Sequence, residues 1–144
     1  MENQINYLVD TNVWLERLLE QEQAETVKEF LDTIPSSKLY LSDFSLHSIG
    51  VILDRLEKIE VFNEFINDLF LNNTVACLSI EPYENIEISK LITDKELDYD
   101  DAYQAVVSKK YEIEIVTFDK DFKKSGIKTL SPKEALENYK KINL

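Results

Sequence analysis

The stretch INYLVDTN, residues 5–12, is a short apolar run that stops at an aspartate. Such a run is typical of a strand that is buried on both faces. Residues 13–20, VWLERLLE, then change to helical spacing of their apolar side chains. The same arrangement returns late in the chain, where EIEIVTF, residues 112–118, is followed by Asp119. We therefore predict two buried strands, each of which leads into an acidic residue.

Between and after these two strands, short apolar runs alternate with segments of helical periodicity. Further strands are expected at residues 38–42, 74–80 and 127–130. Further helices are expected at residues 25–31, 44–56, 61–71, 82–96, 101–111 and 131–141. The alternation predicts an α/β fold, in which a short parallel sheet of four to five strands lies between helices on both faces. No repeat or shift in composition marks a boundary, so residues 1–144 are expected to form a single domain.

Several polar residues are placed to start helices. Asp43 precedes an apolar helical run and is a candidate N-cap. Asp101 stands at the expected start of a later helix, where an acidic side chain also complements the helix dipole. Ser131, Pro132 and Glu134 have the spacing of a capping box with proline at the first helical position.

Composition limits the class of protein. The net charge is −12, and no segment approaches the roughly 18 apolar residues that a membrane span requires, so we expect a soluble, cytoplasmic protein with no membrane partner. The one cysteine, Cys77, lies in an apolar run and is expected to be a buried thiol. Proteins that bind nucleic acid usually show a basic face. RNA binding by this chain would therefore need metal ions at the site or a partner that supplies positive charge.

The aspartates that follow strands are the strongest chemical signal. Neighbouring parallel strands point the same way, and ligands of such sheets bind outside the carboxyl ends of the strands. Asp10 and Asp119 therefore converge if their strands are neighbours. Asp101 adds a third carboxylate just before the second of these strands, and Asp98 and Asp100 stand beside it. Any one of them alone can be explained as a helix cap, so the prediction depends on the combination.

A cluster of carboxylates persists only if a cation or shared protons relieve the repulsion. A hard divalent cation is the simpler solution. Oxygen ligands suit Mg²⁺ or Mn²⁺, and a chain with one histidine and one cysteine offers no basis for a zinc site. Such ions commonly activate water and neutralise charge on a phosphoryl group, so the pattern indicates phosphodiester chemistry.

Three segments resemble the PIN domain family. They are VDTN at residues 9–12, DDA at residues 100–102 and VTFDKDF at residues 116–122. Each is a weak signal by itself, but their order, spacing and placement on strand ends match jointly, and the resemblance covers nearly the whole chain. It implies a three-layer PIN-like fold. PIN domains are often metal-dependent ribonucleases and include the toxin subunits of VapC-type toxin–antitoxin pairs.

The resemblance also implies roles for individual residues. The catalytic and metal-binding carboxylates would be Asp10, Asp101 and Asp119, with Asp121 as a further metal ligand. The groups that orient the carboxylates or the attacking water would be Thr11, Asn12 and Thr117. Apart from the resemblance, the basic pair Lys123 and Lys124 follows the last acidic segment closely and is the best place for a contact to substrate phosphate.

One position departs from the family pattern. Many PIN nucleases carry a glutamate in the helix after the second strand, and the matching position here is Ser48, preceded by His47. A site with one fewer carboxylate is expected to bind Mg²⁺ more weakly and to keep one metal ion instead of two. His47 is then a candidate to compensate as a general acid, a phosphate contact or a Mn²⁺ ligand, although a lone histidine on a helix is more often structural.

Several functional hypotheses follow. The leading one is a metal-dependent endoribonuclease acting on single-stranded RNA, which would be the toxin of a toxin–antitoxin pair and would have an antitoxin partner; homodimers also occur among PIN relatives. The second is a PIN-like module that has lost catalysis and binds RNA or a protein. A phosphohydrolase of the haloacid dehalogenase type and a receiver domain also place aspartates at sheet edges. Asn12 stands where the first of these would have a second aspartate. The second would require an acidic phospho-acceptor close after residues 74–80, and Glu81, the nearest acid, does not stand in the expected place.

Overall fold

The structure is a computed structural model that describes residues 5–143. Five short strands form one sheet in the order β3-β2-β1-β4-β5, and every neighbouring pair is parallel. The strands are β1 (Tyr7–Val9), β2 (Leu39–Ser42), β3 (Ala76–Leu78), β4 (Glu114–Val116) and β5 (Thr129–Leu130). The predicted α/β fold with a short parallel sheet is thus confirmed.

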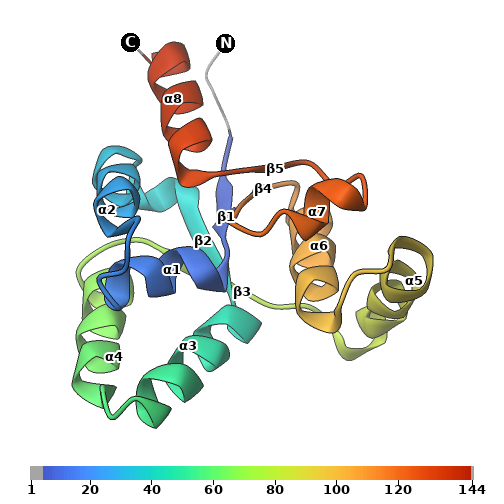
Figure 1. Cartoon of the computed structure of the whole chain (residues 1–144), viewed down its shortest axis with the longest axis horizontal. Helices are drawn as coiled ribbons and strands as arrows, with labels where there is room; N and C mark the ends of the chain where they lie inside the picture. Colours follow the sequence, from blue (N-terminus) through green and yellow to red (C-terminus); the bar gives the residue numbers. More distant parts are fainter. Residues whose placement is uncertain (1–4, 144) are drawn as a thin grey trace.

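Helices connect successive strands and cover both faces of the sheet (Figure 1). The α-helices are α1 (Thr11–Leu18), α2 (Ala24–Thr33), α3 (Asp43–Arg55), α4 (Ile59–Ile66), α5 (Asn85–Lys95), α6 (Tyr99–Tyr111), α7 (Asp121–Lys124) and α8 (Pro132–Asn143). Shorter helical turns are η1 (Ser36–Lys38), the π-type turn η2 (Asn67–Leu71) and η3 (Pro82–Glu84). Within residues 5–143 no helix is long and apolar enough to cross a membrane.

The alternation of side chains along β1 creates two separate cores. Tyr7 and Val9 point to one face, where they pack with Val13, Trp14 and other residues of α1, α2, α3, α4 and α8. Leu8 points to the opposite face and packs with residues of α5, α6 and α7. Successive strand residues face opposite sides, so a fully apolar strand needs a helical layer on each side. This explains why all three residues of β1 are apolar.

Several element boundaries differ from the sequence-based predictions. The N-cap of α3 is Ser42, whose hydroxyl accepts a hydrogen bond from the Ser45 N–H, so the prediction that Asp43 caps this helix is wrong. Asp98 caps α6, which places Asp101 inside the first turn. Ser42 lies one residue before the predicted cap Asp43, and Asp98 lies three residues before the predicted helix start at Asp101. An N-cap side chain accepts a hydrogen bond from a backbone N–H two or three residues later, so it precedes the first acidic residue of the helix.

The edge of the sheet also differs from expectation. Cys77 lies on β3, which is an outer strand, and its side chain is exposed rather than buried. The apolar run at residues 74–80 is covered only in part, because a strand at the sheet edge has a neighbour on one side alone. Burial of a short apolar run therefore depends on the position of the strand in the sheet, which periodicity does not specify.

The capping box of α8 is present as predicted. The Glu134 N–H donates to the Ser131 hydroxyl at 3.1 Å, and the Ser131 N–H donates to the Glu134 carboxylate at 2.9 Å. Ser131→Ala is expected to lower the free energy of unfolding by about 1 kcal/mol, because one N-terminal N–H of the helix loses its acceptor. Urea unfolding measures the change, and Ser37→Ala, at an exposed serine outside the α-helices, is the control. Equal stability of the two variants would contradict this role.

Candidate metal centre

The pairing of β1 with β4 brings the residues that follow the two strands side by side. Val9 is paired with Val116, and the Asp10 N–H continues the ladder by donating to the Val116 carbonyl at 2.9 Å. Directly beyond this bond, the Thr117 hydroxyl donates to Oδ2 of Asp10 at 2.8 Å. Asp10 also caps α1 and is buried, with 6% of its surface exposed. The first carboxylate is therefore held at the carboxyl end of the sheet.

A compact acidic group lies beside this position. Asp101, Asp119 and Asp121 each offer a carboxylate oxygen, and these oxygens lie within 4.8 Å of one another. Asp101 is buried, Asp119 is half-buried and Asp121 is exposed. Oδ2 of Asp101 is buried and has no hydrogen-bond partner among the described residues. Three converging oxygens with graded exposure suit a hard divalent cation that keeps part of its water shell.

The electrostatics of the group show the repulsion that the sequence predicts. Burial, together with the neighbouring carboxylates of Asp119, Asp98 and Asp10, raises the pKa of Asp101 to about 8. Burial also raises the pKa of Asp10, opposed by hydrogen bonds from Gln104, Thr117 and the Thr11 N–H. In the absence of a cation the group holds a proton near neutral pH. A divalent ion would take the place of that proton.

Loop contacts hold the segment between β4 and α7 in place. The Thr117 hydroxyl accepts a hydrogen bond from the Asp119 N–H at 2.9 Å. The Asn12 side chain bridges the same loop: its amide donates to Thr117 at 3.3 Å and its carbonyl accepts from the Phe118 N–H at 3.3 Å. Oδ1 of Asp119 in turn accepts the Asp121 N–H at 2.8 Å. The two acidic side chains of the loop are thus oriented by neighbours in sequence and in space.

A buried polar network on the inner side of Asp10 was not predicted from the sequence. The Gln104 amide donates to Oδ1 of Asp10 at 2.8 Å and to the Ser45 hydroxyl at 2.9 Å. The Thr11 hydroxyl also donates to Ser45, at 2.8 Å. One sequence signal was available for Gln104: it is a polar residue in the apolar run AYQAVV, and it lies three residues after Asp101, on the same side of the helix.

Four further residues that the sequence suggested for the site lie on two helices, Ser48 and His47 on α3 and Lys123 and Lys124 on α7. Ser48 is half-buried and lies one turn after Ser45 on the same side of the helix, so no carboxylate from that position joins the acidic group. His47 is exposed and, two residues from Ser45, points to another side of α3. Lys123 and Lys124 are both exposed: Lys124 lies 3.5 Å from Asp121, whereas Lys123 lies 3.9 Å from a glutamate of α8.

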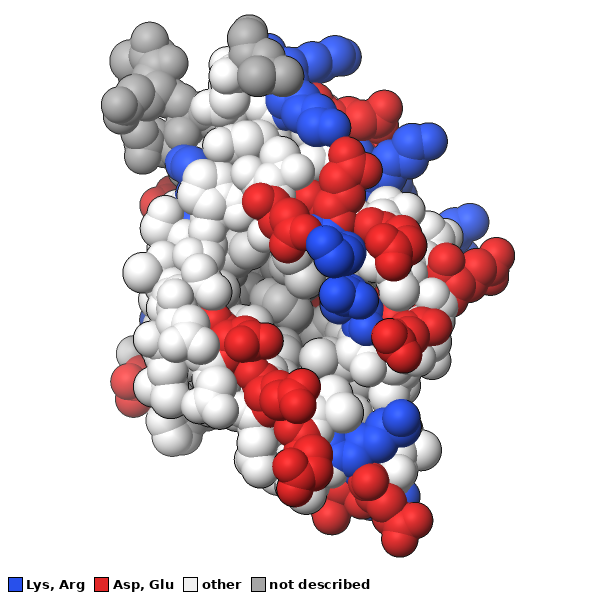
Figure 2. Space-filling model, turned by 90° about the vertical axis from the view of Figure 1, so that its left-hand side faces the viewer, with Lys and Arg blue, Asp and Glu red and all other residues white. Residues whose placement is uncertain are grey.

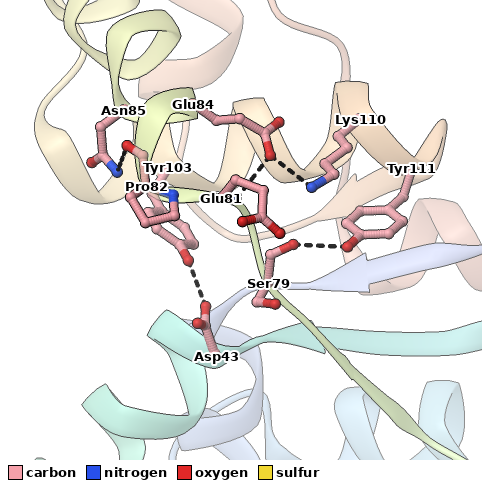
Figure 3. Close-up of polar contacts among 9 residues, drawn as sticks. All are labelled: Asp43, Ser79, Glu81, Pro82, Glu84, Asn85, Tyr103, Lys110 and Tyr111. Atoms are coloured by element: carbon pink, nitrogen blue, oxygen red, sulfur yellow. Dashed lines mark hydrogen bonds and ion pairs between the residues drawn. The ribbon is translucent and has the colours of Figure 1, made fainter.

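Further contacts fix α6, the helix that carries the central aspartate of the group (Figure 3). The Tyr103 hydroxyl reaches across to the start of α3 and donates to Asp43 at 2.5 Å. Burial and this bond raise the pKa of Tyr103. At the other end of α6, Lys110 pairs with Glu84 at 2.6 Å, and the Tyr111 hydroxyl donates to a main-chain carbonyl after β3 at 2.7 Å. Asp43 thus serves to position the helix and lies outside the acidic group.

The raised pKa of Asp101 predicts a particular dependence of stability on pH. Between the ordinary pKa of 3.8 and the folded value of about 8, the folded chain holds a proton that the unfolded chain has released. Stability contributed by this group therefore falls as pH rises through that window and levels off above it. Asp101→Asn is expected to remove this fall, so that the variant is more stable than the native chain at pH 9 in EDTA.

Urea midpoints at pH 5, 7 and 9, with and without Mg²⁺, measure this effect. Mg²⁺ is expected to stabilise the native chain at pH 9 and to leave Asp101→Asn unchanged. Asp54→Asn, at an exposed position on α3, is the control and should follow the native curve. Parallel curves for Asp101→Asn and the native chain would show that Asp101 does not titrate in this window.

The chain was compared with known proteins. The PIN domain profile matches residues 7–128. A protein named VapC ribonuclease, from Aquifex aeolicus (strain VF5), is 28% identical over 134 residues, which cover 88% of this chain and 97% of that protein. The match therefore extends over nearly the full length of both proteins.

Solved structures share the same fold. One is Mycobacterium tuberculosis VapC20, described as a Sarcin-Ricin loop cleaving toxin, with a TM-score of 0.73, 19% identity and coverage of 88% of this chain and 100% of that one. Another is a toxin–antitoxin complex from Klebsiella pneumoniae, with a TM-score of 0.70, 19% identity and coverage of 88% and 98%. Because the matching profile spans strands β1 to β4, as well as every residue of the acidic group, this chain belongs to the PIN domain family.

Proposed function

We propose that this chain is a Mg²⁺- or Mn²⁺-dependent endoribonuclease and the toxin of a toxin–antitoxin pair. The observation that carries the proposal is the convergence of carboxylate oxygens from Asp101, Asp119 and Asp121 within 4.8 Å, together with the buried, unpartnered Oδ2 of Asp101. The resemblance of the chain to a VapC ribonuclease supports the same activity. An oxygen-only site of this kind favours a hard cation over zinc.

Each residue has a distinct task in this proposal. A cation held by the aspartates supplies positive charge for phosphoryl oxygens and activates water. Asp101, Asp119 and Asp121 hold it. Asp10 lies outside this group but interacts electrostatically with Asp101 and Asp119, and its Oδ2 accepts one hydrogen bond and keeps a lone pair. Thr117 orients both Asp10 and the Asp119 loop, so a substitution there would disturb the positions of two carboxylates together.

RNA is the substrate that we propose, despite the net charge of −12. A bound divalent cation reverses the potential locally, where the scissile phosphate must lie. A cavity of about 470 Å³ adjoins the site through Asn12 and Phe118, and Lys120 also lines it. A half-buried aromatic ring beside a lysine suits an unpaired base and its phosphate. Lys124, next to Asp121, is a second candidate for a phosphate contact.

Cleavage of single-stranded RNA in Mn²⁺ tests this activity. Asp119→Asn and Asp101→Asn are each expected to lower the rate at least about 100-fold, because each removes charge that holds the ion in the reacting site. Asp54→Asn, on the exposed side of α3, is the control and is expected to keep the native rate. Activity that survives in both site variants would come from a contaminant and would contradict the proposal.

The proposed antitoxin partner would dock on a different face. A cavity of about 770 Å³ lies between α1, α2, α4 and η2, with the apolar side chains of Trp14, Val61 and Phe65 among its lining. Figure 2 looks onto the side of the molecule where α2 and α4 lie and shows a hollow bordered by both acidic and basic side chains. Four acidic residues line the cavity, against two basic ones: Glu20, Asp32, Glu64 and Asp68, with Arg17 and Lys58. A basic, amphipathic segment of an antitoxin complements this surface.

The double variant Glu64→Lys with Asp68→Lys tests this surface. It is expected to lose at least about tenfold in affinity for a small basic protein that co-purifies with the untagged native chain, because two attractive charges become repulsive. RNA cleavage by the variant should stay at the native rate, since α4 and η2 are not part of the acidic group. Unchanged affinity, measured by surface plasmon resonance, would place the partner elsewhere.

A PIN module without catalysis is the second candidate function. The observation that favours it is Ser48, which offers no carboxylate where many PIN nucleases have a glutamate. The two functions differ in one measurable property: the module would bind RNA or protein with no dependence on a divalent ion. Binding that EDTA leaves unchanged, with no cleavage in Mn²⁺, would favour the module.

A further inference from the structure

Gln104 is a buried polar residue in a helix segment whose other buried side chains are mainly apolar. It lies on α6 with 1% of its surface exposed, and its neighbours Ala102, Val106 and Val107 belong to the core under β1 and β4. An apolar residue would be the ordinary choice at such a position. The side chain extends instead toward Asp10, so its polarity serves the site and not the packing of the helix.

The orientation of the amide is fixed by its partners. Nε2 has two hydrogens, and two acceptors receive them: Oδ1 of Asp10 at 2.8 Å and the Ser45 hydroxyl at 2.9 Å. The reverse orientation would set the amide oxygen against the carboxylate oxygen, with no donor between them. Oδ1 of Asp10 also accepts the Thr11 N–H at 2.9 Å. Both acceptor positions of this oxygen are therefore occupied by protein donors.

The orientation of the Gln104 amide leaves its oxygen without a hydrogen bond. Oε1 is buried and has no partner among the described residues. A buried polar atom without a partner is destabilising, and in a native protein such an atom calls for an explanation. The compensation is the donation by Nε2 to a buried carboxylate, since hydrogen bonds to charged groups are the stronger ones.

We propose that Gln104 is a positioning residue that occupies, as a neutral donor, the inner side of the Asp10 carboxylate, so that this site holds one divalent cation. The inference rests on the proposed metal-dependent function. A cation on the Oδ1 side of Asp10 would have to displace the amide hydrogens, and Ser48, where many PIN nucleases have a glutamate, offers no further carboxylate. The single ion then lies among Asp101, Asp119 and Asp121, on the open side of the site.

Two measurements on the native chain test the proposal. Calorimetry with Mn²⁺ is expected to give one ion per chain. In ¹⁵N-edited spectra, the side-chain NH₂ protons of Gln104 are expected to stay slow in exchange with water both without metal and with saturating Mg²⁺, because the amide remains on Asp10. Two ions per native chain, or loss of this protection on Mg²⁺ binding, would overturn the role of Gln104. A native chain that binds no divalent ion would contradict the proposed function as well.

Gln104→Glu provides the matched variant. A carboxylate in place of the amide would bring a further negative charge to Asp10, and either a shared proton or a second cation relieves the repulsion. At about pH 8 and saturating Mn²⁺ the cation is expected to replace the proton. The ion count is therefore expected to rise from one to two per chain, with a spin-coupled Mn²⁺ signal in electron paramagnetic resonance. Gln21→Glu adds the same charge at an exposed position and should keep one ion. One ion in Gln104→Glu, with unchanged affinity, would overturn the proposal; if that variant does not fold, the native measurements decide.

Discussion

The parallel pairing of β1 with β4 is the constraint on which the rest of the site depends. Its register matches Val9 with Val116 and lets Asp10 continue the ladder by one more hydrogen bond. Because the strands run the same way, the residues that follow them emerge at one edge, and the Asp10 carboxylate meets the Thr117 hydroxyl there. A shift of one residue in this register would turn the side chains to opposite faces and separate the acidic groups.

Once the strands are paired, buried carboxylates lie close together, and packing alone does not relieve their desolvation and mutual repulsion. Asp10 and Asp101 are both buried, and burial raises the pKa of each. Backbone and side-chain donors stabilise Asp10, whereas Oδ2 of Asp101 has no donor within residues 5–143. Asp10 therefore receives hydrogen bonds from protein donors, whereas Oδ2 of Asp101 remains available to an external positive charge. The neutral Gln104 amide is one of the donors to Asp10.

Much of the architecture followed from the sequence, because strands covered by helices on both faces are mainly apolar. The mainly apolar runs at residues 5–9 and 113–116 therefore identified the central pair β1 and β4. Assignment to the PIN family removes the haloacid dehalogenase and receiver alternatives. Features that depend on tertiary contacts, such as helix caps and the burial of single side chains, could not be predicted correctly from the sequence. Ser42 caps α3 in place of Asp43, and Cys77 is exposed because β3 is an outer strand.

The site shows the same limit. Three of the acidic residues in the motifs, Asp101, Asp119 and Asp121, lie together, and Asp10 lies outside that group. Gln104 and Ser45 could not be identified from the sequence, because each lies in an ordinary helical run and the two meet only through a contact between residues 59 positions apart. The most direct test of the central claim is anomalous diffraction from crystals soaked in Mn²⁺. One peak is predicted, roughly 2.1–2.2 Å from carboxylate oxygens of Asp101 and Asp119. No peak at this sheet edge, with the carboxylates in the same positions, would contradict the account.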